Sequence, residues 1–342
     1  MFRGSVAKFA VVLLLSGLLA SCKRAGSHPE VTEVRIPRGA GGVGFLPLLA
    51  MEKYQLIEKH ANANGLKSLH VRWINIGGPS IVNDAMLSGS ADFIAAGPPA
   101  FLTLWDKTLG STNVKGVAAM SSVPMYLNTR AEHMKALQDI RVDDRIAVTA
   151  IKVSIPAILM QMYAAQRYGI MDAPHFDPFT VTMTHPDGVI ALLSGSNAVN
   201  AHFTSPPFHQ REVKDPSVRT ILTSDEVLQG PATFTMLSTD SAFRQGNPNV
   251  FAAVRAALEE ATQMLTADKK LGAKLLFDSM NGGGFTVSEM EQILEDPAIR
   301  FTTTPENIMK YADFMLQIGS IKNQPASWKD LFFPEGAAGP GS

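Results

Sequence analysis

A strand signal, a glycine-rich turn and a helical pattern follow one another three times in the first part of this 342-residue chain. Residues 31–37 alternate apolar and polar side chains and lead into the turn 38–44, residues 70–76 lead into the turn 77–80, and residues 91–95 lead into the turn 97–99. Strands that alternate with helices predict right-handed crossovers and a mainly parallel sheet. In such sheets ligands bind beyond the carboxyl ends of the strands, so the three turns are expected to meet at one crevice.

A second block repeats this order of elements. Strands are predicted at 145–150, 179–183 and 198–203, with helices at 154–168 and 187–194 between them. Residues 117–128 form a further extended stretch, and 233–238 a strand that returns to the first block, followed by helices at 249–267, 269–279, 288–295 and 305–318.

Crossings near Asn128 and near Gly230 therefore divide the chain into two lobes. Lobe one is expected at 31–128 and 230–335, lobe two is inserted at 129–229, and a flexible tail follows at 336–342. Two lobes joined by two strands permit hinge closure around a ligand.

The amino-terminal segment 1–21 has the layout of a secretory signal peptide. Arg3 and Lys8 give it a basic start, an apolar run follows at 9–19, and small residues end it. Because this run is shorter than the roughly 20 residues that a membrane-spanning helix needs, removal after export is expected.

Cys22 follows this segment directly. The sequence Leu19-Ala20-Ser21-Cys22 resembles the bacterial lipobox, where the signal peptide is cut before a lipidated cysteine. Cys22 is the only cysteine of the chain, so it has no partner for an internal disulfide, and lipidation gives it a role. Residues 22–30 are then a tether that anchors the protein at the periplasmic or extracellular face of a membrane. The alternative is an ordinary cleavage site with an incidental cysteine.

Composition and motifs weigh against several classes of function. The formal net charge of −1 does not favour nucleic acid as a partner. The chain has no Gly-x-Ser-x-Gly elbow, no P-loop and no dinucleotide-binding fingerprint, so neither catalysis nor a cofactor is predicted. His202 and His209 are seven residues apart, which is not a recognised metal-ligand spacing, and no metal is predicted.

Several motifs resemble those of the nitrate/sulfonate/taurine group of periplasmic binding proteins. They occur, in order, at 77–80, 85–92, 97–100, 185–195 and 247–250. The resemblance implies an α/β fold of the type II periplasmic binding protein class, with two lobes of mainly parallel sheets joined by a two-strand hinge. It also implies the monomeric solute-binding component of an ABC importer, with a permease and an ATPase as partners.

Contacts to a ligand are expected first at helix starts and turns. Ser80 and Ser154 are each predicted to open a helix, whose unpaired N–H groups and dipole suit an anion, although each can be a plain helix cap. The turns supply further candidates, which can also be turns and nothing more: Gly42, Val43, Gly44, Phe45, Gly78 and Gly97.

Lobe two supplies the remaining candidates. His202, Phe203 and Thr204 end a predicted strand, where His202 would hydrogen-bond a ligand and Phe203 would stack on it. A lone histidine is more often structural. His185 and Asp187 are predicted at a helix entry, with Asp187 in the capping position, where they serve either the helix start or a ligand contact.

The expected ligand is a small organic anion such as an alkyl sulfonate, a taurine-like compound or an aromatic carboxylate. A pyrimidine or thiamine precursor is the alternative ligand. A ligand-presenting adaptor for a sensor is an alternative role. An enzyme is the least favoured reading, because the cysteine-rich motif of the pyrimidine synthases that share this fold is missing.

Overall fold

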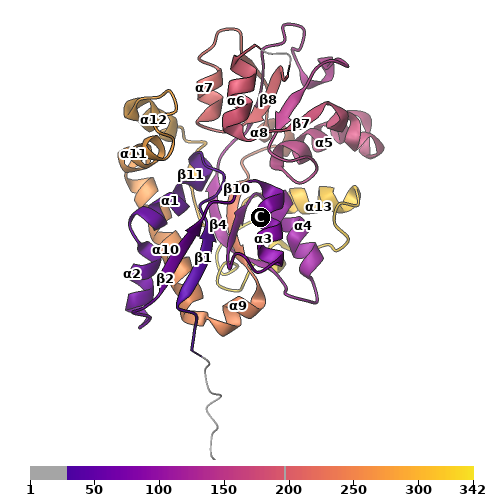
Figure 1. The fold of residues 1–342 in the computed structure, drawn as a ribbon. Helices are drawn as coiled ribbons and strands as arrows, with labels where there is room; N and C mark the ends of the chain where they lie inside the picture. Colours follow the sequence, from indigo (N-terminus) through magenta and orange to yellow (C-terminus); the bar gives the residue numbers. More distant parts are fainter. Residues whose placement is uncertain (1–28, 196–197) are drawn as a thin grey trace, which may run out of the picture.

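The computed structural model describes residues 29–195 and 198–342, which form two lobes that meet at a waist (Figure 1). The predicted signal peptide and Cys22 lie outside the described residues. The first lobe contains β1 (Glu33–Pro37), η1 (Val43–Phe45), α1 (Leu46–Lys53), α2 (Leu56–Ala63), β2 (His70–Ile74), α3 (Pro79–Leu87), β3 (Ile94–Ala96), α4 (Pro98–Thr108), β4 (Lys115–Ser122), β10 (Thr233–Thr239), α9 (Ser241–Gly246), α10 (Pro248–Ala267), α11 (Lys269–Ser279), α12 (Val287–Leu294), β11 (Arg300–Phe301), α13 (Ile308–Gln317) and η4 (Trp328–Leu331).

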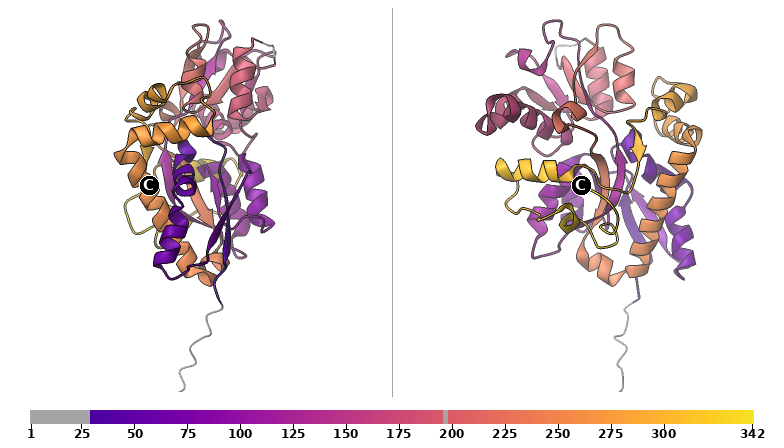
Figure 2. Two further views of the ribbon diagram at one scale, coloured as in Figure 1. Left: turned by 60° about the vertical axis from the view of Figure 1, so that its left-hand side comes forward. Right: turned by 180° about the vertical axis from the view of Figure 1, so that it is seen from behind.

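The strands of the first lobe form one layer with helices on both sides (Figure 2). β1 and β2 pair in parallel, and β11-β4-β10-β3 form a neighbouring antiparallel sheet. The N–H groups of Asp92 and Phe93 donate to the carbonyl of Arg35 at 3.0 and 3.3 Å, which joins β1 to the chain before β3. The Arg35 guanidinium also pairs with the Asp92 carboxylate at 2.6 Å.

The second lobe contains β5 (Tyr126–Thr129), η2 (Leu137–Asp139), β6 (Ile146–Val148), α5 (Ile155–Tyr168), η3 (Ile170–Phe179), β7 (Thr180–Thr182), α6 (His185–Leu193), β8 (Ala201–Thr204), α7 (Phe208–Glu212), β9 (Arg219–Thr223) and α8 (Ser224–Leu228). Its sheet has the order β7-β6-β8-β5-β9. β7, β6 and β8 are parallel, while β5 runs antiparallel to both of its neighbours.

The chain crosses between the lobes at residues 123–125 and again at 229–232. The extended stretch predicted at 117–128 is therefore two strands in two sheets, β4 and β5, because Pro124 lacks the N–H group that a continuous ladder needs. The strands next to the crossings run antiparallel to their partners, β4 to β10 and β5 to β8.

Two segments expected to be loose are hydrogen-bonded. Glu30, placed in the tether, accepts from the N–H groups of Asn249 and Val250 at the start of α10, at 3.1 and 2.8 Å. In the predicted tail, the carbonyl of Ser342 accepts from the N–H of Ile308 at 2.9 Å, and the Ser342 N–H donates to Pro305 at 3.0 Å. A helix start offers unpaired N–H groups, and both segments satisfy some of them. Across residues 29–195 and 198–342, no helix combines the length and apolarity needed to cross a membrane.

Candidate ligand-binding site

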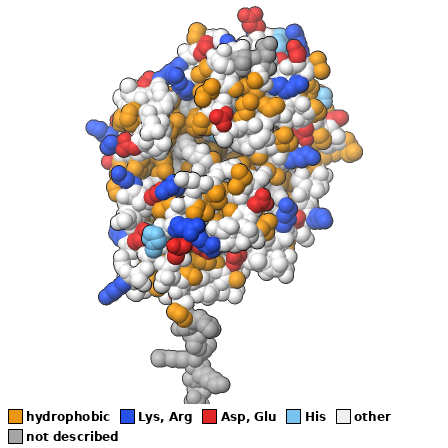
Figure 3. Space-filling view, viewed as in Figure 1, with side chains coloured by type: hydrophobic (Ala, Val, Ile, Leu, Met, Phe, Trp, Pro, Cys, Tyr) orange, Lys and Arg blue, Asp and Glu red, His pale blue; other side chains and the backbone are white. Residues whose placement is uncertain are grey.

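A cavity of about 70 Å³ lies where the two lobes meet. This volume is several times the roughly 10–15 Å³ that a cavity needs to hold a single water. Figure 3 shows apolar side chains gathered on both lobes beside the waist. The lining comes from both lobes and from the crossings: Ala40, Gly41, Phe45, Gly78, Pro79, Val82, Ala95, Ala96, Gly97, Ala100, Met125, Thr149, Val153, Ser154, Ile155, Pro156, His185, Phe234 and Thr235.

Four helices begin at this cavity: α3 and α4 from the first lobe, α5 and α6 from the second. Gly78 caps α3 with a φ of 89°, a conformation that glycine adopts readily. Ser154 caps α5, and its Oγ accepts from the Ala157 N–H at 3.4 Å. Each of the four helices has proline in its first turn, where no N–H is needed. The positive ends of four helix dipoles therefore face one small space.

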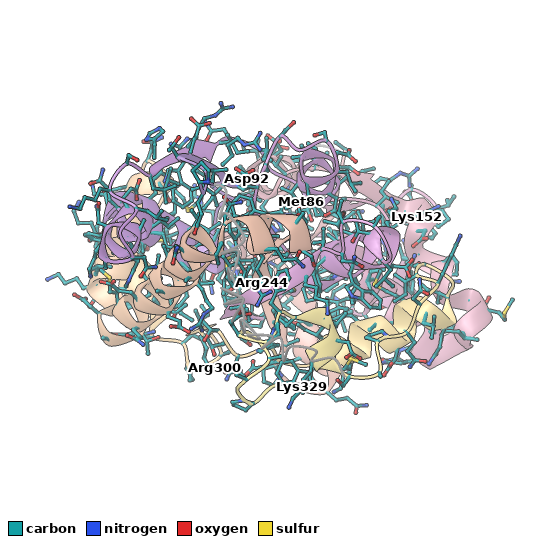
Figure 4. All side chains as sticks on the ribbon, turned by 90° about the horizontal axis from the view of Figure 1, so that it is seen from below. Met86, Asp92, Lys152, Arg244, Arg300 and Lys329 are labelled. Carbon is teal, nitrogen blue, oxygen red and sulfur yellow. The ribbon has the colours of Figure 1, made fainter. Side chains whose placement is uncertain are left out.

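The lining is mostly apolar, and within the described residues it includes no Asp, Glu, Lys or Arg. Two of its polar groups have protein partners. Ser154 Oγ donates to the Ala150 carbonyl at 2.5 Å, and Thr235 Oγ1 donates to the Gly44 carbonyl at 2.6 Å. Lys152, labelled in Figure 4, belongs to the loop before α5 but lies outside the lining. A polar group placed here would meet helix ends and hydrogen-bonding groups rather than a charged side chain.

His185 is the titratable side chain at the cavity. Its ring stacks on Phe208, with the ring centroids 5.3 Å apart, and its Nδ1 lies 3.0 Å from Nε2 of His202. Burial, followed by electrostatic repulsion from the neighbouring His202 ring, holds the pKa of His185 well below its usual range, so the ring is neutral near pH 7. In the part of the chain that is described, no cluster of three His, Cys, Asp or Glu side chains is arranged to hold a metal.

The structure brings four of the predicted site residues to the cavity: Phe45, Gly78, Gly97 and Ser154. Gly42 lies beside it, in a second hollow of about 890 Å³ that shares Ala40 and Gly41 with the first.

Ser80 and Asp187 lie elsewhere than predicted. Ser80 is exposed and outside the lining, and it is the second residue of α3, because Gly78 takes the capping position. Asp187 is also exposed, and its carboxylate accepts from the Thr184 hydroxyl at 2.6 Å at the start of α6. Asp187 thus serves the start of α6, and neither residue lines the cavity.

The predicted contacts of β8 are buried inside the second lobe. His202, Phe203 and Thr204 have no exposed surface, and none of them lines the cavity. His202 does not contact the cavity directly, because His185 lies between the His202 ring and the cavity.

Val43 and Gly44 have structural roles. The N–H of Val43 donates to the Pro206 carbonyl of the second lobe at 3.1 Å. At Gly44 a Cβ atom would lie 2.1 Å from the Phe234 ring, so only glycine fits there.

Sequence reasoning placed His185 with Asp187 at a helix entry where a ligand contact is possible, and of these two the structure brings His185 to the cavity. It did not single out Met125 or Phe234 as lining residues. Met125 and Phe234 carried no such helix-entry signal, because Met125 belongs to the first crossing and Phe234 to β10 just after the second, and both reach the cavity through the packing of the lobes.

Several contacts among the described residues join the lobes around the cavity. Besides the Val43–Pro206 hydrogen bond, Gly42 and Gly97 face side chains of the other lobe, where added Cβ atoms would lie 3.1 Å from Phe208 and 2.7 Å from Ile155. At the rim, Lys214 pairs with Glu289 at 2.5 Å, which lowers the pKa of the Glu289 carboxyl. The two lobes are therefore in direct contact beside the cavity.

Two α/β lobes, a two-strand crossing and a cavity between them define the fold as that of type II periplasmic binding proteins. No protein-family model matches the chain, and no curated protein sequence matches it.

Solved structures do match. The alkanesulfonate-binding protein SsuA from Xanthomonas axonopodis pv. citri bound to MOPS has 17% identity and a TM-score of 0.65, over 86% of this chain and 96% of that one. The periplasmic nitrate-binding protein NrtA from Synechocystis PCC 6803 has 15% identity and a TM-score of 0.66, over 91% and 85%. The ligand-binding component of an ABC-type import system from Staphylococcus aureus, with zinc bound, has 13% identity and a TM-score of 0.63, over 90% and 98%. At these identities the likeness establishes the fold.

Proposed function

We propose that this chain is the extracytoplasmic solute-binding component of an ABC importer and that it holds a small organic anion between its lobes. The observation that carries the proposal is the cavity between the lobes at which four helices, two from each lobe, begin. Unpaired N–H groups at helix starts can bind an anion without the help of a charged side chain. Within the described residues, the lining of this cavity contains no Asp, Glu, Lys or Arg. Solved neighbours with this fold are named as sulfonate- and nitrate-binding proteins.

The apolar lining favours an organic ligand over a bare inorganic ion. Phe45, Val82 and Ile155 offer carbon surface that nitrate cannot use. A cavity without charged groups also suits a neutral heterocycle, which keeps a pyrimidine or thiamine precursor as the second candidate.

A thermal-shift screen tests the proposal, with propanesulfonate, taurine, benzoate, nitrate and a hydroxymethylpyrimidine as probes. Binding stabilises the folded state by RT ln(1 + [L]/Kd), about 2.7 kcal/mol at a hundredfold excess over Kd. Stabilisation by sulfonates or carboxylates supports the anion, and stabilisation by the pyrimidine alone supports the second candidate. A compound recovered chemically altered after incubation would contradict the binding role.

The proposal includes export and a lipid anchor at Cys22, which would keep the protein beside a permease and an ATPase. The support is the lipobox-like sequence after the apolar run, in residues outside those that the structure describes.

A further inference from the structure

A chain of buried polar groups leads from the cavity into the second lobe. His185 Nδ1 lies 3.0 Å from His202 Nε2, and His202 Nδ1 lies 2.5 Å from Oε1 of Glu212. The amide of Asn128 donates to Oε2 of the same carboxylate at 2.8 Å. The side chains of His202 and Glu212 are completely buried, so water cannot stabilise a charge on either one.

Burial fixes where the protons of this chain lie. A fully buried carboxylate without a counter-charge is costly even when it accepts hydrogen bonds, so a neutral His202 donating from Nδ1 to a charged Glu212 is disfavoured and the pair is neutral overall. Either an imidazolium stands beside a carboxylate, or a neutral imidazole accepts from a carboxylic acid. In the first arrangement both nitrogens of His202 carry protons. In the second, Nδ1 accepts from the acid and the single ring proton is on Nε2. His202 Nε2 is therefore protonated in both.

A protonated Nε2 on His202 donates to His185 Nδ1, the ring nitrogen that faces it. His185 is neutral, so its own proton is on Nε2. Nε2 has no hydrogen-bond partner within residues 29–195 and 198–342, and the ring borders the cavity.

Packing holds both rings in place. Phe208 stacks on His185, with 29° between the ring planes. α6 lies so close to His202 that a Cβ atom on Gly188 would be 2.6 Å from its ring. Neither imidazole can turn over to exchange its nitrogens without moving these neighbours.

We propose that His185 presents a fixed, uncharged N–H donor to the cavity and selects a ligand that places an acceptor oxygen there. His202 and Glu212 are positioning residues that set the tautomer of His185. This inference rests on the proposed function, because it names the chemical group of the ligand, an acceptor oxygen, that His185 would bind. A sulfonate or carboxylate oxygen fits the donor, whereas an ammonium group would face it with N–H bonds of its own.

Nitrogen-15 NMR of the ligand-free protein tests the donor without any ligand. Long-range ¹H–¹⁵N correlations at neutral pH should show His185 protonated on Nε2 alone, with the signal assigned by its loss in His185→Phe. A proton on Nδ1 alone, or on both nitrogens, would overturn the proposal. His202→Phe removes the donor to Nδ1, so the Nε2 form should no longer be the sole one. A His185 that stays wholly in the Nε2 form in folded His202→Phe would overturn the positioning roles.

Calorimetry with propanesulfonate and propylammonium tests the selection. We expect propanesulfonate to bind the parent, and His185→Phe to weaken it by about tenfold or more, as for a hydrogen bond to a charged group. His175→Phe, at an exposed histidine of the same lobe, is the matched control and should leave Kd unchanged. Equal affinity in His185→Phe, or tighter binding of propylammonium, would overturn the selection. If the parent protein binds no anion in this assay or in the screen, the proposed ligand class is wrong. The NMR experiment still decides separately whether His185 carries its proton on Nε2.

Discussion

The contact between Gly97 and Ile155 allows closure to be perturbed without disturbing either lobe. Gly97 has φ −75° and ψ 162°, which any residue adopts, so alanine adds no backbone strain there. The new Cβ would lie 2.7 Å from Ile155 Cδ1 across the waist and 3.2 Å from the Phe234 carbonyl. Overpacking of this kind costs about 1–3 kcal/mol. Separation of the lobes relieves the clash with Ile155, so most of the cost should fall on closure rather than on folding.

For Gly97→Ala the closure constant should therefore fall by roughly fivefold to a hundredfold. Pulsed electron-spin resonance measures it directly, with spin labels on Met171→Cys in the second lobe and Lys107→Cys in the first, in a Cys22→Ser background. The distance distribution should shift toward a longer, open population, while the unfolding midpoint changes little.

Ile155→Ala removes the atoms that clash, so the double variant should recover part of the closed population. Gly246→Ala is the matched control, because a Cβ there meets nothing within 4 Å. If Gly97→Ala lowers the unfolding midpoint with an unchanged distance distribution, or if Ile155→Ala gives no recovery, the contact does not govern closure.

Three further predictions concern stability and location. Burial lowers the pKa of His209 to about 4, and burial also lowers the pKa of His185. Between about pH 6.5 and pH 5 these two histidines therefore take up protons in the unfolded chain but not in the folded chain. The free energy of unfolding should then fall as the pH falls, by at most about 1.4 kcal/mol per pH unit for each histidine and by less for the partly exposed His209; urea titrations that give a flat profile would contradict this. Gly188→Ala should destabilise by about 1–3 kcal/mol in the same assay through its clash with a buried ring, whereas Gly246→Ala should be close to neutral. Cys22→Ser should move the protein from the membrane to the soluble fraction, and mass spectrometry that finds the parent unmodified at this residue would refute the anchor.

The sequence predicted the architecture well, because its signals are local. Alternation at 31–37 anticipated β1 at Glu33–Pro37, and the glycines and prolines of the turns marked where α3 and α4 begin. The same signals placed some helix starts wrongly by one or two residues. Gly78 rather than Ser80 caps α3, which the preference for proline at the first helical position would have indicated.

Which residues of the second lobe line the cavity depended on tertiary structure. All four residues of β8 are buried, so this strand has no apolar–polar alternation to show which side chains face the cavity. The sequence therefore supplied two histidines, His185 and His202, without the means to order them. Packing of α6 over β8 placed His185 at the cavity and His202 behind it. What the chain determined by itself was the set of elements and their order, since periodicity and turn chemistry act over a few residues. Which side chains meet across the waist was decided by close approaches between residues distant in sequence, such as Gly97 with Ile155, and these exist only once the lobes have folded and closed.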